Sequence, residues 1–135
     1  VNKSMKSKIL IFIAATAFYV FVACENQINS PEDLVFPEKN VSFFEHVQPF
    51  LKYYCAYQGC HSPETRAGGK WYSDWVSIFD TDNLGFVVPY NPDGSRFVQI
   101  IEGKSLSHLT YFRNEIKQNH VQGIRTWILE GALDN

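Results

Sequence analysis

The stretch Cys55-Ala-Tyr-Gln-Gly-Cys60-His61 most strongly constrains what this chain can fold into, because it brings two thiols and an imidazole close together. Cysteine thiols add across the vinyl groups of a haem as thioethers, and a histidine directly after the second cysteine can bind the iron. The usual motif leaves two residues between the cysteines, whereas this one leaves four. The stretch therefore predicts one covalent c-type haem held by Cys55, Cys60 and His61, with a small domain built around it.

Two other chemistries remain open for the same residues. An oxidising compartment would permit a small disulfide loop between Cys55 and Cys60, although this would leave His61 without a role. A structural zinc site would need a second histidine as fourth ligand, and the adjacency of Cys60 and His61 makes a tetrahedral arrangement awkward.

The N-terminal residues predict export. Lys3, Lys6 and Lys8 precede an uncharged, almost wholly apolar run over residues 9–23 that ends at Cys24. A basic start, an apolar run and small residues at the break point are typical of a secretory signal. The apolar run is shorter than the roughly 20 residues of a membrane-spanning helix, and an uncleaved N-terminal anchor is the alternative. We therefore expect residues 1–23 to be a cleaved signal peptide.

The residues Phe21-Val22-Ala23-Cys24 resemble a bacterial lipobox, apart from Phe21, where leucine is usual. Lipidation of Cys24 would account for the odd number of cysteines, since it leaves Cys55 and Cys60 as a pair. The expected location is the periplasm or cell envelope, with a lipid anchor rather than a span holding the protein to the inner or outer membrane.

Charge narrows the classes of partner. Residues 1–23 hold three of the twelve basic residues and none of the fourteen acidic ones, so the remainder has a formal net charge of −5. An acidic surface argues against nucleic acid as a partner and against a polybasic patch that would bind a membrane. We expect redox proteins of the cell envelope as partners.

The remainder divides into a tether and one small domain, because 135 residues suffice for a single domain and a leader. Residues 24–40 are polar and contain Pro31 and Pro37, so they predict a tether, with residues 34–36 packing against the domain where it ends. Residues 41–135 are expected to form the domain.

The patterns within the domain predict helices. Ser42 is a candidate cap for a helix that runs into Cys55, with Pro49 in its first turn or at a kink. Further helices are expected at 96–102, capped by Ser95, and after Asn119, which is the candidate cap of a last helix in which apolar residues recur at helical spacing. A short helix within residues 71–79 would deliver aromatic surface, which suits either a flat cofactor or a small core. The predicted class is all-α.

The chain resembles, over about residues 41–135, a small single-domain c-type cytochrome found in lipoproteins and large exported proteins of Bacteroidetes, Planctomycetes and related bacteria. The segments that carry this resemblance are 47–50 (Val-Gln-Pro-Phe), the motif at 55–61, the turn at 88–95 (Val-Pro-Tyr-Asn-Pro-Asp-Gly-Ser) and the ending at 124–132 (Ile-Arg-Thr-Trp-Ile-Leu-Glu-Gly-Ala). The four-residue spacer between the cysteines also occurs in that family. The resemblance implies a cytochrome c-like helical fold around one haem c.

The chain departs from that family at the second axial ligand of the iron. The family usually has a methionine between the turn and the final helix, but the only methionine here is Met5, in the leader. His108 lies where that methionine would stand, so the resemblance makes it the candidate sixth ligand, and loss of the Met/His pair would lower the reduction potential. His46, His120 or no protein ligand are the alternatives. We expect His120 to be a solvated surface residue and His46 to be at the surface or near the ligands.

The expected function is electron transfer by a monohaem carrier and not enzymatic catalysis, because no phosphate loop, nucleophile triad or telling carboxylate pair is present. A haem-based sensor of a gas ligand, with the sixth position open, is the alternative.

Overall fold

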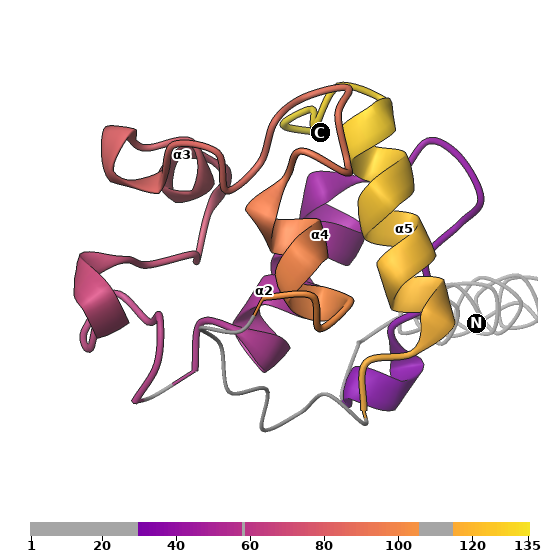
Figure 1. The fold of residues 1–135 in the computed structure, drawn as a ribbon. Coiled ribbons are helices and arrows are strands. Elements are labelled where there is room, and N and C mark those ends of the chain that lie inside the picture. The colour runs from indigo at the N-terminus through magenta and orange to yellow at the C-terminus, as the bar shows by residue number, and fades with distance from the viewer. Residues whose placement is uncertain (1–29, 58, 106–114) are drawn as a thin grey trace, which may run out of the picture.

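The computed structural model describes residues 30–57, 59–105 and 115–135 (Figure 1). Within these ranges the chain forms helices and turns and no β-strand, which confirms the predicted all-α class. None of the helices in these ranges is both long and apolar enough to cross a membrane. In chain order the elements, with η for the short turns of other helical types, are η1 (Pro31–Asp33), η2 (Phe43–Val47), α2 (Gln48–Tyr54), η3 (Ala67–Gly69), α3 (Trp75–Ile78), η4 (Thr81–Asn83), α4 (Arg96–Ile101) and α5 (Gln118–Leu129).

The helix that leads into the cysteine motif begins as predicted. The Ser42 hydroxyl accepts a hydrogen bond from the backbone N–H of Glu45 at 3.2 Å, which caps η2. Pro49 lies in the first turn of α2, directly after the π-helical turn η2. The chain therefore passes from a π-helical turn into α2, which ends directly before Cys55.

The predicted apolar face of the last helix is buried in the core. Ile124, Trp127 and Ile128 have no exposed surface, and α5 lies beside α4 (Figure 1). Helix α4 spans Arg96–Ile101, as expected, but the Ser95 hydroxyl donates to the carbonyl of Asn91 and leaves the helix end without a side-chain cap. The other fully buried large side chains include Phe43, Phe50, Phe86, Phe97, Leu34, Leu51 and Ile78.

Residues 34–41, which we call the strap, run along α5. The side-chain amide of Asn119 pairs with the backbone of Phe36, accepting from its N–H at 2.8 Å and donating to its carbonyl at 2.9 Å. The Glu130 carboxylate accepts from the N–H groups of Asn40 and Val41 at 2.6 and 2.9 Å. Leu34 and Phe36 are buried as expected, so this part of the stretch predicted as a tether packs on the domain.

The strap overturns two predictions for the start of the last helix. His120 is fully buried and not solvated, because the strap covers it: its Nε2 donates to the carbonyl of Leu34 at 3.0 Å. Its Nδ1 accepts from the backbone N–H of Lys117 at 3.2 Å. Asn119 is not the cap residue, since α5 begins at Gln118 after Lys117, and its amide binds the strap instead.

Gly123 allows the strap to approach α5 closely. A Cβ at this position would overlap the ring and Cβ of Phe36. Gly123→Ala should therefore lower the free energy of unfolding by up to about 2 kcal/mol, because overpacking costs about 1–3 kcal/mol and helix propensity returns roughly 1 kcal/mol. Urea titration of this variant beside Gln122→Ala, at an exposed neighbour on the same helix, measures the effect. A more stable Gly123→Ala protein would contradict the close packing.

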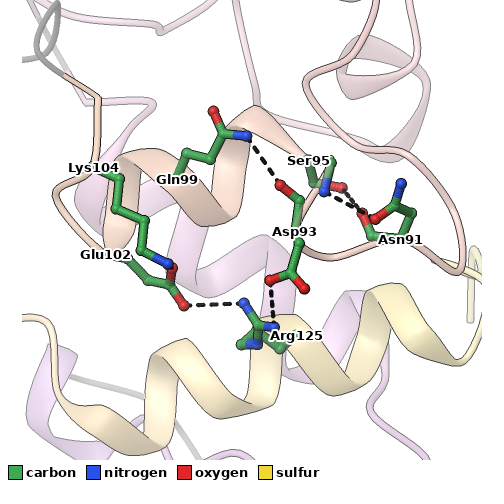
Figure 2. A network of polar contacts seen from close by, with 8 residues as sticks. Asn91, Asp93, Ser95, Gln99, Glu102, Lys104 and Arg125 are labelled. Atoms are coloured by element: carbon green, nitrogen blue, oxygen red, sulfur yellow. Dashed lines mark hydrogen bonds and ion pairs between the residues drawn. The ribbon is translucent and has the colours of Figure 1, made fainter.

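A polar network joins the turn before α4 to α5 (Figure 2). The Arg125 guanidinium binds the carboxylates of Asp93 at 2.7 Å and Glu102 at 3.0 Å, and Lys104 pairs with Glu102 at 2.6 Å. Arg125 lowers the pKa of the Asp93 carboxyl by hydrogen bonding and by its charge. The network links these segments, and the two pairs that involve the exposed side chains of Asp93 and Lys104 each contribute only about 0–1 kcal/mol.

Candidate functional site

The Cys/His motif is a compact turn at the end of α2. The backbone N–H of His61 donates to the carbonyl of Cys55 at 3.0 Å, which closes the stretch between them. The carbonyl of Cys60 accepts from the N–H of Ala67 at 2.9 Å and from the Thr65 hydroxyl at 2.7 Å. These hydrogen bonds hold the described ends of the motif together, so all three motif residues lie close to one another in the chain's fold.

The two cysteines are free thiols, partly buried and not joined by a disulfide. Burial, together with the neighbouring Cys60, raises the pKa of the Cys55 thiol to about 12. Cys55 therefore stays protonated at neutral pH in the folded chain. Because thiolates are the species that form disulfides and react with alkylating agents, this protonation protects Cys55 from both reactions.

His61 is held by the segment that follows η3. Its Nδ1 lies 3.1 Å from the carbonyl oxygen of Lys70, which can only accept, so Nδ1 carries the proton. Its own carbonyl accepts from the N–H of Tyr72 at 3.1 Å. The lone pair of the neutral ring is therefore on Nε2. Metal-ligating histidines in proteins usually have this arrangement, with the other ring nitrogen donating to a carbonyl or carboxylate.

Aromatic side chains pack behind the imidazole. The Tyr72 ring lies 4.7 Å from that of His61 and stacks on Phe86 at 4.2 Å, with 4° between the planes. Phe86 in turn stacks on Phe97 at 5.0 Å. Burial raises the pKa of the Tyr72 hydroxyl to about 12, so Tyr72 remains a neutral wall. The expected short aromatic helix is only Trp75–Ile78, and Tyr72 reaches the imidazole from the loop before it.

The other predicted residues lie away from this loop or outside the description. The Nδ1 of His46, which is partly exposed, accepts from the N–H of Ser42 at 3.2 Å, and its ring packs on Phe36. His120 is buried under the strap. The predicted sixth ligand His108 and the predicted lipidation site Cys24 lie outside the described residues. Within the described ranges no three His, Cys, Asp or Glu side chains converge on a single metal position.

The donor set fits a haem, because a haem takes from the protein two thiols and one axial nitrogen and not a cage of ligands. Cys55 and Cys60 are reduced, and the tautomer of His61 directs the lone pair to Nε2. Sequence reasoning missed the Lys70 carbonyl, since every residue has one and its side chain gives no signal. Comparisons of the chain with models of protein families, with curated proteins and with solved structures found no match.

Proposed function

We propose that this chain is a monohaem c-type cytochrome that carries single electrons in the cell envelope. Cys55 and Cys60 would hold the haem by thioether bonds, and Nε2 of His61 would be the proximal ligand. The hydrogen bond from His61 Nδ1 to the Lys70 carbonyl carries the proposal, because it orients the ring and makes Nε2 the better ligand. When bound, the haem supplies an iron that cycles between Fe(III) and Fe(II).

The remaining parts of the proposal rest on the sequence. His108 is the proposed distal ligand of the iron. Cys24 is the proposed site of the lipid anchor after removal of residues 1–23, and redox proteins of the cell envelope are the proposed partners. The described residues contribute packing around the proposed ligand. The Tyr72 ring packs against His61 and Phe86 stacks on Tyr72, and this packing would help to keep the imidazole in one position in both oxidation states.

Covalent attachment is the decisive test, since it survives denaturation. The chain, exported from a bacterium with a c-type haem maturation system, should give a haem-stained band on a denaturing gel. Cys55→Ser combined with Cys60→Ser should lose all covalent haem, because no thioether can form. Cys24→Ser is the matched control: it should keep the stain and lose only membrane attachment.

Three results would count against this proposal. An unstained wild-type band with zinc in metal analysis would favour the structural zinc module, and an unstained band with a Cys55–Cys60 disulfide would favour the disulfide loop. Fast carbon monoxide binding by the ferrous protein would favour a gas-binding domain with an open sixth position over a six-coordinate electron carrier.

A further inference from the structure

The main-chain segment that supports His61 follows two glycines, and backbone bonds from the Lys70 N–H to the Ala67 carbonyl at 3.3 Å and from the Tyr72 N–H to the His61 carbonyl hold it in part. Gly68 and Gly69 have φ angles of +64° and +77°, in the region that glycine adopts most readily. Lys70 directly follows these glycines, and its carbonyl accepts a hydrogen bond from the Nδ1–H of His61. Because the two preceding glycines have much conformational freedom, a side-chain anchor at Lys70 would restrain this carbonyl beyond what the two backbone bonds provide.

The Lys70 side chain supplies that anchor. It is partly buried, and its ammonium donates to the carbonyl of Asp82 and to the side-chain oxygen of Asn83, the latter at 3.3 Å. Both acceptors belong to η4, so a turn more than ten residues further along the chain holds the segment that supports the imidazole.

Asn83 is in turn fixed on every side. It is 2% exposed, its side-chain N–H donates to the carbonyl of Ser77 at 2.6 Å, and its backbone N–H donates to the carbonyl of Asp80 at 2.8 Å. A buried amide needs partners for both ends of its side chain, and here the acceptor end is directed at a lysine. The hydrogen-bonded chain therefore runs from Ser77 through Asn83 and Lys70 to the Nδ1 of His61.

We propose that Lys70 and Asn83 are positioning residues for His61, holding the Lys70 carbonyl where it keeps the proton on Nδ1 and the lone pair on Nε2. Both act through the main chain and neither touches the ligand position. This role rests on the proposed function, because a fixed position of Nε2 is useful only if His61 is an axial ligand. The effect on the tautomer is a property of the chain itself and can be measured without haem.

Nitrogen-15 NMR of the His61 ring in the haem-free chain is the direct measurement. Lys70→Met keeps the Lys70 carbonyl and the apolar stem but removes the ammonium, and should lower the ratio of Nδ1–H to Nε2–H tautomer about fivefold, the factor for about 1 kcal/mol. Asn83→Asp keeps an acceptor for Lys70 but removes the N–H that binds Ser77, so it should give a smaller fall. Lys39→Met, at an exposed lysine of the strap, should leave the ratio unchanged.

The haem-loaded protein gives a second readout. A weaker hydrogen bond from Nδ1 makes the imidazole a poorer donor, so the midpoint potential of Lys70→Met should rise relative to Lys39→Met. An unchanged tautomer ratio in a folded Lys70→Met protein would overturn the proposal. A changed ratio in a chain that takes up no haem would support the positioning role while removing the proposed function, so the two are separable.

Discussion

Trp127→Ala is expected to lower the free energy of unfolding by about 3–5 kcal/mol. The side chain is fully buried, its ring centre lies 5.8 Å from that of Phe43, and its Nε1 donates to the carbonyl of Leu133 at 3.0 Å. Truncation would leave a cavity between α5 and η2 and an unpaired carbonyl near the C-terminus. Urea titration followed by circular dichroism measures the change.

Leu129→Ala is the matched control, because Leu129 lies on the same helix and is 55% exposed. It should change stability by no more than about 0.5 kcal/mol. If Trp127→Ala cost less than about 1.5 kcal/mol, the placement of this ring at the centre of the core would be contradicted.

His120 is expected to make the fold acid-labile well above the range where carboxylates titrate. Burial lowers the pKa of its imidazole in the folded chain, and Lys117 lowers it further, whereas the bond to the Leu34 carbonyl opposes this shift. The ordinary value of 6.5 applies when the chain is unfolded, so below that pH the unfolded state binds a proton that the folded state does not. Stability should be complete above pH 6.5 and fall below it by up to about 1.4 kcal/mol per pH unit, until the folded pKa is reached.

The groups that face His120 explain why protonation is unfavourable. Its Nδ1 accepts from the N–H of Lys117, and a second ring proton would point at that N–H. The rings of Phe50 and Tyr54 pack around it at 5.6 and 5.7 Å, and burial raises the pKa of the Tyr54 hydroxyl, so Tyr54 itself supplies no negative charge.

Urea titrations at a series of pH values between 7 and 4.5 measure the effect, with His120→Gln as the control that removes the titrating group. The carboxyls of Asp80 and Asp93 have lowered pKa values, so their contribution is lost only as pH falls below their ordinary value of 3.8. An identical pH dependence in wild type and His120→Gln would refute the assignment.

Local patterns in the sequence predicted the helices and the entry to the motif well. The cap at Ser42, the place of Pro49 and the buried stripe of α5 depend on residues within a few positions of one another. Such features follow from helix geometry and backbone hydrogen bonding, and need no knowledge of distant segments.

Features that depend on distant segments were not predicted. The prediction that His120 is solvated was wrong, because the residues that cover it, Leu34 and Phe36, lie more than eighty positions earlier in the chain. The carbonyl of Lys70 and the buried amide of Asn83 were missed for a similar reason. The Lys70 carbonyl approaches His61, and the Asn83 side chain approaches Lys70, only once the loop after the motif has folded back. The spacing of apolar residues along the sequence does not predict such a fold.

The strap has a consequence for the order of folding. Leu34 pairs with His120 and Asn40 with Glu130, separations of 86 and 90 residues, and contacts this distant in sequence form late and slowly. The core cannot close until α5 has been made, so a newly synthesised chain passes through a stage in which the motif has been made but the core against which Cys55 packs has not yet closed. During that stage the Cys55 thiol lacks the burial that raises its pKa to about 12. The late closure of the domain thus leaves an interval in which the Cys55 thiol is accessible to chemistry that the finished fold restricts.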